Sequence, residues 1–191
     1  MASKLKCVSP LEGRYNRSTS VLSDYFSEHA LQKYRVGVEI DYLKALSDLG
    51  VVRKFGDSEL KELNGIKRLP LSEAVKIKEI ETKGYAGFKP TNHDVKAVEY
   101  YLRNKFAGSS LENLSEFIHF ALTSEDVSNI AYALMIRDSL NEVMVPKLES
   151  IVSSLYSVAD NNSSVPMLAR THGQPASPTT FGKEMRVFAS R

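Results

Sequence analysis

The sequence predicts an all-α fold. Apolar residues recur every three or four positions in most segments, which is the period of a helix with one buried face. Alternating runs typical of strands are nearly absent. With 191 residues, of which 42% are hydrophobic and 25% charged, the chain can bury a substantial core. We expect a small N-terminal helical domain, residues 1–108, followed by the beginning of a long-helix bundle, residues 109–191.

Four helices are predicted in the first of these domains. The longest apolar stripe covers residues 31–49. A short helix should begin at Asp57 and end at Asn64-Gly65, and another should begin at Leu71. Residues 83–90 contain two glycines and a proline and therefore form a break. The fourth helix presents the apolar positions Val95, Val98, Leu102 and Phe106.

Longer helices are predicted after Gly108. One apolar pattern covers residues 111–122 and a second runs from Glu125 to Val158. Pro146 lies near the middle of the second pattern and should kink or divide the helix.

The last predicted helix should begin at Ser177, with the serine as N-cap and Pro178 at the first helical position. Its apolar face is Phe181, Met185 and Phe188. This pattern is unfinished at Arg191 and lacks a C-cap, which indicates a truncated element.

The composition excludes several classes of protein. The 25 basic and 23 acidic residues give a net charge of +2, which does not indicate a nucleic-acid or membrane surface. The single cysteine, Cys7, excludes an internal disulfide framework and multi-cysteine metal sites. No run approaches the ~20 apolar residues of a membrane span, and residues 1–10 lack the apolar run of a secretory signal. We therefore expect a cytoplasmic protein with no nucleic-acid or membrane partner.

The most distinctive chemistry lies at His172. It follows Arg170-Thr171 and precedes Gly173-Gln174, and two prolines come shortly after. A histidine held in a rigid polar turn suits proton transfer, because its free pKa lies close to neutral pH.

A second histidine, His93, directly precedes a predicted helix. A capping box made by Thr91 and Asp94 explains those two residues. It does not explain Asn92 and His93, which would project near the positive helix end, where anions bind.

Two further groups could bind an anion. Thr123 and Ser124 precede acidic residues at a helix start, where one hydroxyl suffices as a cap and two also suit a substrate carboxylate. Arg14 follows Gly13, and its planar guanidinium suits phosphate or carboxylate, although a simple surface arginine fits the pattern as well. Taken alone, the pattern favours simple capping for the two hydroxyls and a surface position for Arg14.

The remaining histidines and the missing motifs narrow the chemistry. His29 lies on a polar helix face and is expected to be solvated, whereas His119 lies among apolar residues and should be a packed structural histidine. Metal-site spacings, glycine-rich phosphate loops and nucleotide fingerprints are absent. The pattern predicts a multiply anionic substrate and proton transfer with no metal and no cofactor.

Four segments in a fixed order resemble one known family: residues 8–15, 91–100, 115–126 and 170–176. Across essentially its whole length the chain resembles the N-terminal part of the adenylosuccinate lyases of bacterial type, within the fumarase/aspartase superfamily. The resemblance implies that superfamily's helical bundle and a carbon–nitrogen lyase. It also implies a homotetramer in which motifs from three subunits form each active site.

The activity implied by the resemblance is β-elimination of fumarate. The substrates are adenylosuccinate, which gives AMP, and SAICAR, which gives AICAR, in purine nucleotide biosynthesis. His172 would donate a proton to the leaving nitrogen, and His93 would lie beside the substrate phosphate or the catalytic histidine. The residues that would hold the substrate are Arg14, Tyr15, Asn92 and Asp94 for the nucleotide and Thr123 and Ser124 for a succinyl carboxylate.

The catalytic base of this family, a serine on a flexible loop, would lie beyond Arg191, so we expect no turnover by these 191 residues alone. Two alternatives remain. One is another elimination enzyme of the superfamily, such as fumarase or argininosuccinate lyase. The other is a non-catalytic helical module whose exposed stripe of Phe181, Met185 and Phe188 binds partners.

Overall fold

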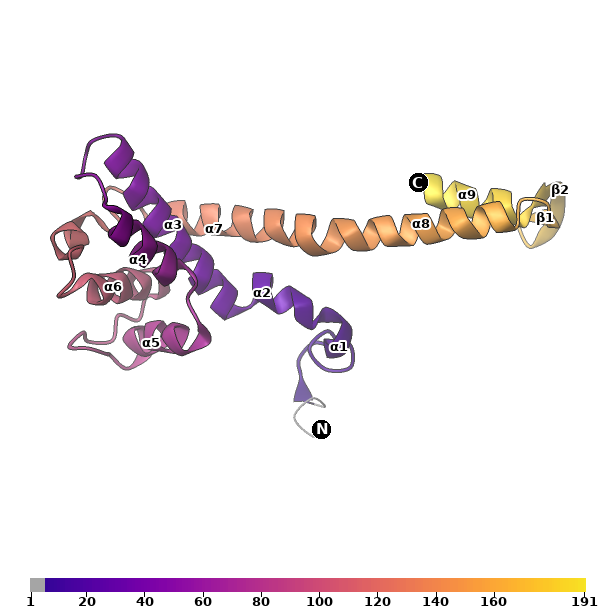
Figure 1. The fold of residues 1–191 in the computed structure, drawn as a ribbon. Coiled ribbons are helices and arrows are strands. Elements are labelled where there is room, and N and C mark those ends of the chain that lie inside the picture. Colours follow the sequence, from indigo (N-terminus) through magenta and orange to yellow (C-terminus); the bar gives the residue numbers. More distant parts are fainter. Residues whose placement is uncertain (1–5) are drawn as a thin grey trace. The chain divides into compact units, whose positions relative to one another are not determined.

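The computed structural model describes residues 6–191 and confirms a mainly helical fold (Figure 1). The chain divides into two compact units, Met1–Ser139 and Leu140–Arg191, which we describe separately. The domain boundary predicted after Gly108 is not tested by this division and stays a prediction. The segment expected to lack a secretory signal, residues 1–10, lies partly outside the described residues.

The first unit is built around one long helix. The short turns α1 (Asn16–Thr19), η2 (Ser20–Leu22) and α2 (Ser23–Phe26) precede the 21-residue helix α3 (Glu28–Asp48). The elements that follow are α4 (Asp57–Lys67), α5 (Leu71–Thr82), α6 (Asp94–Phe106), η3 (Glu112–Phe117) and α7 (Ser124–Ser139). Helix α3 contacts α4, α5, α6 and α7, and it therefore supports every other long helix of the unit.

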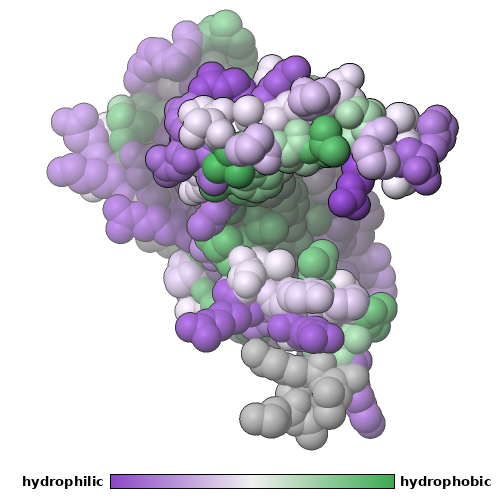
Figure 2. Space-filling model, turned by 90° about the vertical axis from the view of Figure 1, so that its right-hand side faces the viewer, coloured by the Kyte–Doolittle hydropathy of each residue, from purple (hydrophilic) through white to green (hydrophobic). Residues whose placement is uncertain are grey.

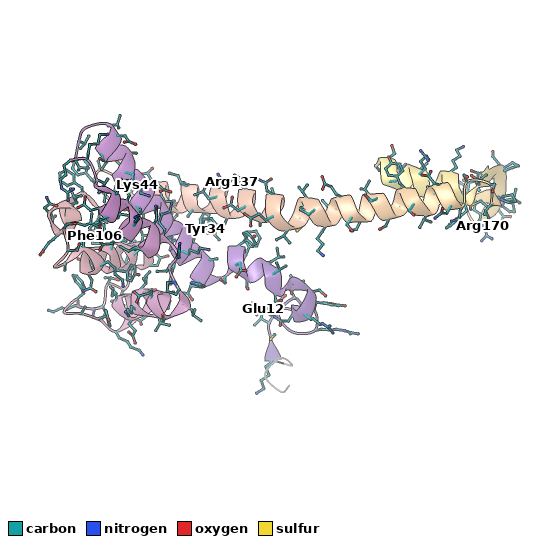
Figure 3. All side chains as sticks on the ribbon, viewed as in Figure 1. Glu12, Tyr34, Lys44, Phe106, Arg137 and Arg170 are labelled. Carbon is teal, nitrogen blue, oxygen red and sulfur yellow. The ribbon has the colours of Figure 1, made fainter. Side chains whose placement is uncertain are left out.

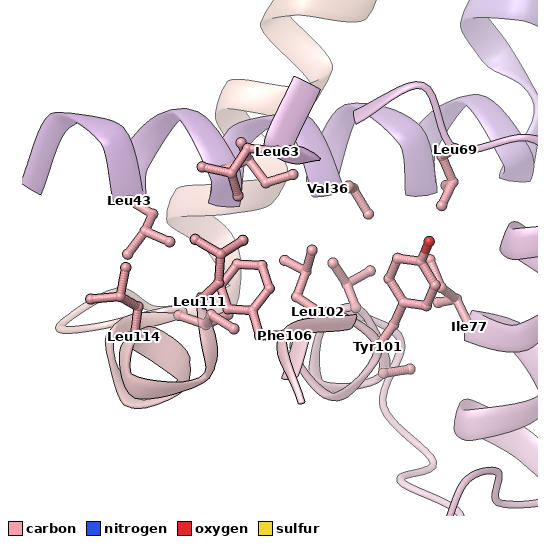
Figure 4. Close-up of a cluster of buried hydrophobic side chains, with 14 of the residues drawn as sticks. Val36, Leu43, Leu63, Leu69, Ile77, Tyr101, Leu102, Phe106, Leu111 and Leu114 are labelled. Carbon is pink, nitrogen blue, oxygen red and sulfur yellow. The ribbon is translucent and has the colours of Figure 1, made fainter. Parts of the chain in front are cut away.

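The apolar stripe of α3 forms the centre of the hydrophobic core (Figure 4). Ser27 caps the helix by accepting the N–H of Ala30 at 3.1 Å. On the buried face, Val36 and Leu43 are fully enclosed. They meet Leu63 of α4, Ile77 of α5, and Leu102 and Phe106 of α6.

Two predicted helix boundaries in this unit are wrong. Helix α4 continues past Gly65 to Lys67, because Ile66 packs on the core and Lys67 binds Asp41 at 2.6 Å, which offsets the ~1 kcal/mol cost of a helical glycine. The helix expected over residues 111–122 is only the 3₁₀ segment η3. It cannot continue, because His119 and Ala121 have φ values of 61° and 57°.

The second unit begins where the long helical pattern is divided. The π-helical turn η4 (Leu140–Met144) is followed by α8 (Val145–Asn161). Pro146 is the second residue of α8. In place of the kink or division expected at Pro146, the structure has a π-helical turn just before it, between α7 and α8. Among the described residues no helix is long and apolar enough to cross a membrane.

The predicted helix start at Ser177-Pro178 is wrong. These two residues belong to a two-stranded antiparallel hairpin formed by β1 (Pro166–Thr171) and β2 (Gln174–Thr180). Pro178 is tolerated because a two-stranded sheet consists of edge strands only. Helix α9 (Phe181–Ser190) begins after the hairpin, with Thr180 as its N-cap.

The apolar face predicted for α9 is turned partly to solvent. Phe181 and Phe188 are 37% and 57% exposed, whereas Gly182 and Ala189 are buried. Helix α9 contacts α8 through this buried side. The stripe is therefore exposed within the unit, as the helical-module alternative expects.

The cap of α9 leads to a first testable prediction. The Thr180 hydroxyl accepts the N–H of Lys183 at 3.2 Å, so Thr180→Ala should destabilise the protein by ~1 kcal/mol. The neighbouring Thr179 has a buried hydroxyl without a hydrogen-bond partner in the described chain. Thr179→Val is therefore the matched control, with a change of no more than ~0.5 kcal/mol. Urea unfolding measures both, and an equal loss in the two variants would contradict the assigned cap.

A buried carboxylate fastens the loop before α4 to the segment before η3. The Glu59 carboxylate accepts hydrogen bonds from Arg53 at 2.7 Å, from the Gly56 N–H at 2.9 Å and from the Ser110 hydroxyl at 2.8 Å. The Arg53 hydrogen bond is the largest of the effects that lower the pKa of Glu59 to about 2.

This ionised carboxylate predicts a pH-dependent stability difference. Because the folded-state pKa of Glu59 is below its unfolded-state value, its contribution is present above pH ~4.5 and is lost as the pH falls toward 2. Wild type should exceed Glu59→Gln in unfolding free energy at pH 6, and the gap should narrow at pH 3. Urea unfolding of the two proteins at pH 6 and at pH 3 measures this gap. The other carboxylates titrate in both proteins, so their effect cancels in the comparison. A gap that stayed constant would show that Glu59 is not ionised against Arg53.

Candidate active site

His93 caps the N-terminus of α6. Asn92, with φ of 48°, donates its N–H to the Glu81 carbonyl at 2.9 Å and turns the chain from α5 toward α6. His93 then accepts the N–H of Lys96 on Nδ1 at 3.2 Å. Because Nδ1 is the acceptor, the proton of the neutral imidazole lies on Nε2.

The capping box expected from Thr91 and Asp94 does not form. The Thr91 hydroxyl bonds to the backbone of His93, donating to its carbonyl at 2.9 Å and accepting its N–H at 3.3 Å. Asp94 Oδ1 accepts the adjacent Val95 N–H at 2.8 Å. The imidazole takes the N-cap position instead, because its Nδ1 reaches the N–H of the third helical residue.

The start of α7 separates the roles of its two hydroxyl residues. Thr123 donates both its N–H, at 2.7 Å, and its hydroxyl, at 3.0 Å, to Asp126 Oδ2. The Thr123 N–H bond is the largest cause of the lowered pKa of Asp126. The Ser124 hydroxyl lies 3.5 Å from His93 Nε2. Ser124 is therefore the hydroxyl directed toward the histidine.

Two cavities meet at His93. One, of about 330 Å³, is lined by Thr91, His93, Val95, Lys96, Glu99, His119 and Ser124. The other, of about 390 Å³, is lined by Glu28, Leu31, Gln32, Arg35, Glu81, Asn92, His93 and Asp94. The structure thus brings four predicted site residues to these cavities, Asn92, His93, Asp94 and Ser124, and Thr123 lies next to Ser124 in the chain.

Arg14 and Tyr15 lie in a separate N-terminal segment. The Tyr15 N–H bonds to the Pro10 carbonyl at 2.9 Å, and the Arg14 guanidinium carbon lies 5.9 Å from the Tyr15 ring centroid. Both side chains are exposed. Neither lines the two cavities described above, so the described residues do not join them to the His93 cluster.

His172 occupies the tip of the hairpin in the second unit. It forms a two-residue turn with Gly173, and both have positive φ, 49° and 77°. This is the backbone of the tightest antiparallel hairpin turn, which matches the twist of the strands. The imidazole is exposed. Arg170, labelled in Figure 3, lines a cavity of about 500 Å³ beside the hairpin, together with Met167, Pro175 and Glu184.

The two remaining histidines are both hydrogen-bonded. The expectation that His29 is merely solvated is wrong, because it is half-buried and its Nε2 donates to the Leu69 carbonyl at 2.7 Å. His119 pairs through Nδ1 with Glu39 Oε1 at 2.6 Å, consistent with a packed histidine. Its side chain nevertheless lines the same cavity as Ser124, which the sequence did not indicate.

Two buried charged residues of α3 escaped the sequence analysis. Arg35 binds Asp94 at 2.6 Å and the Ser128 hydroxyl at 3.1 Å, and Glu39 holds His119. Burial acts to raise the pKa of Asp94, but the Arg35 hydrogen bond and charge hold it below its usual value. Burial also raises the pKa of Glu39, against the opposing hydrogen bonds from His119. The available signal was a pair of charges inside an apolar helical run.

Curated relatives of the chain are adenylosuccinate lyases. The enzyme of Dictyostelium discoideum is 46% identical over 98% of this chain and 40% of its own length. The enzyme of Escherichia coli (strain K12) is 41% identical over 99% of this chain and 41% of its own length. The chain therefore spans about two fifths of the length of these relatives.

Solved structures and a family model agree with this similarity. A fumarate lyase from Mesorhizobium sp. BNC1 superimposes with a TM-score of 0.69 at 23% identity, covering 90% of this chain and 37% of its own. The beta-carboxy-cis,cis-muconate cycloisomerase from Acinetobacter calcoaceticus sp. ADP1 superimposes with a TM-score of 0.67 at 22% identity, with the same coverage. At these identities the two structures show the fold alone. A family model described as lyase matches residues 13–191, and the chain therefore belongs to the lyase family.

Proposed function

We propose that the chain supplies the N-terminal part of an adenylosuccinate lyase. Such an enzyme releases fumarate by β-elimination from adenylosuccinate and from SAICAR, giving AMP and AICAR. The identity of 41–46% to adenylosuccinate lyases over nearly the whole chain supports this substrate class. The observation that carries the proposal is the meeting of His93 and Ser124, 3.5 Å apart at two helix N-termini.

The chemistry of this cluster fits a substrate with a phosphate and two carboxylates. Helix N-termini carry partial positive charge and free N–H groups, so α6 and α7 favour an anion between them. Lys96 lines the same cavity, where its ammonium donates to the Glu99 carboxylate at 2.7 Å. In our proposal Ser124 and the adjacent Thr123 hold a succinyl carboxylate. His93 lies beside the phosphate or the catalytic histidine.

The other proposed roles follow from the resemblance. His172 donates a proton to the leaving nitrogen, which avoids expelling an unstable anion and contributes ~10²–10⁴-fold to the rate. The nucleotide is held by Arg14, Tyr15, Asn92 and Asp94. Asp94 also pairs with buried Arg35, which fixes the start of α6 beside the ligand.

We also propose a cytoplasmic homotetramer with active sites shared between subunits. Large apolar side chains lie at the surface of the second unit, and Figure 2 shows such residues in green. On α8 they include Leu148, Ile151 and Val152. A helix face of this kind is expected to be covered by another copy of the chain.

The second candidate is a non-catalytic helical assembly module, which the same exposed face favours. A direct assay of fumarate release by the full-length protein that carries this chain distinguishes the lyase from the assembly module. We expect release from adenylosuccinate on the order of 10 per second and none from argininosuccinate. The 191 residues alone should be inactive. Faster fumarate release from argininosuccinate would indicate another elimination enzyme of the superfamily. Assembly without any fumarate release would favour the non-catalytic helical module.

A further inference from the structure

Helix α3 directs three polar side chains toward the candidate site. Arg35 and Glu39 are one helical turn apart, and only 5% and 2% of their surfaces are exposed. Tyr42 follows on the same side and donates its hydroxyl to the Phe120 carbonyl at 3.0 Å. Burying charges is costly unless they are paired and hydrogen-bonded. Such a row on one helix therefore indicates that the exact placement of its partners is important.

Glu39 uses both carboxylate oxygens on a single residue. Oε2 accepts the backbone N–H of His119 at 3.0 Å, and Oε1 lies 2.6 Å from the His119 ring nitrogen Nδ1. The two residues are 80 positions apart in the chain. Glu39 therefore fixes the backbone and the imidazole of His119 at once.

The turn held in this way is conformationally strained. His119 and Ala121 both have left-handed backbones, with φ of 61° and 57°. Side-chain-bearing residues keep such angles only where surrounding contacts impose them. Glu39 and Tyr42 provide these contacts from α3, at His119 and at the Phe120 carbonyl.

The strained turn leads directly into the candidate site. Residues 118–123 connect η3 to α7, and Ser124 is the first residue of that helix. The His119 side chain also lines the cavity that contains His93 and Ser124. Arg35 completes the support, because it joins Asp94, next to His93, to Ser128, one turn after Ser124.

We propose that Glu39 is a positioning residue that, through His119, fixes the 118–123 turn and so holds the Ser124 hydroxyl at His93. The functional part of this proposal rests on the proposed lyase activity. The structural part, that Glu39 fixes the 118–123 turn, does not depend on that activity.

The test compares Glu39→Gln with Glu59→Gln. Glu59 is the matched control, since it is also a mostly buried glutamate with both oxygens hydrogen-bonded, but its partners are Arg53, Gly56 and Ser110. In the 191-residue chain, amide exchange over residues 119–126 should accelerate about tenfold in Glu39→Gln. In Glu59→Gln, exchange there should change only as much as overall stability changes.

The second readout is kinetic and uses the full-length protein. If Ser124 binds a substrate carboxylate, Glu39→Gln should raise the KM for adenylosuccinate about tenfold and change kcat less, whereas Glu59→Gln should leave KM unchanged. Tyr42→Phe removes the Phe120 bond and provides a milder variant, with faster exchange at the same turn, should Glu39→Gln fail to fold.

The outcomes separate the two proposals. Equal local exchange in Glu39→Gln and Glu59→Gln, after correction for stability, would overturn the positioning role. Faster exchange at the turn with an unchanged KM would overturn its functional part. If the wild-type full-length protein released no fumarate, the proposed function would fail, and the exchange comparison would still decide whether Glu39 holds the turn.

Discussion

Replacing His172 with Asn should reduce fumarate release from adenylosuccinate by ~10²–10⁴-fold, because general acid catalysis contributes that much to a rate. Asn is the appropriate replacement since it also tolerates the left-handed backbone, and φ at His172 is 49°. The hairpin turn should therefore persist while the titratable group is lost. Steady-state kinetics of the full-length protein measures the effect, which should fall on kcat more than on KM.

The matched control removes a different histidine. His29→Asn deletes the hydrogen bond to the Leu69 carbonyl. Because His29 itself lines neither cavity at His93, this change should lower stability without lowering kcat. If His172→Asn retained kcat within about threefold, less than any general-acid contribution, His172 would not be the proton donor.

Replacing Gly182 with Val should destabilise the second unit by ~3 kcal/mol. A Cβ at this position would overlap the Ala159 carbonyl oxygen and lie 2.7 Å from the Ser163 backbone nitrogen. Both obstacles are backbone atoms where α8 ends, so no side-chain rotation can relieve the overlap. Helix α9 must move away from α8 and lose the buried contact of Ala189.

Gly65→Ala is the control for this change. The ideal Cβ of Gly65 has no atom within 4 Å, and the residue lies inside α4, so alanine should stabilise by ~0.5–1 kcal/mol. Urea unfolding followed by circular dichroism measures both variants. Similar midpoints for Gly182→Val and wild type would mean that α9 does not pack as closely on α8 as described.

The helices were predictable because their signals are local. The apolar period predicts α3, α5 and α6 at close to their observed positions, since each helix buries one continuous stripe. The extension of α4 past Gly65 was not predictable, because it depends on packing with residues distant in the sequence.

The hairpin could have been recognised from its turn. A two-residue loop that contains glycine is a hairpin signal, and His172-Gly173 is such a loop. The Ser177-Pro178 pair matches a helix start just as well, and only the pairing of Leu168 with Pro178 distinguishes the two interpretations. Helix-start signals therefore need the neighbouring strand as context.

The residues of the candidate site could be predicted from the sequence, but the residues that hold them in place could not. His93 and Ser124 belong to separate helix starts, and their polar sequences indicate anion binding locally. The supports Arg35 and Glu39 act across 59 and 80 positions in the chain, on Asp94 and His119. No local pattern encodes such pairings, so a buried charge in an apolar helix was the sole indication.

Whether the His93 cluster and His172 serve one active site is tested most directly by mixing two inactive variants of the full-length protein. His93→Asn keeps a good N-cap and removes the imidazole, and His172→Asn removes the proposed proton donor. In a tetramer with shared sites, exchange of subunits combines intact His93 and intact His172 in some active sites. We predict that the mixture releases fumarate faster than either variant alone. Hybrid tetramers, identified by native mass spectrometry, that remained inactive would contradict a shared site.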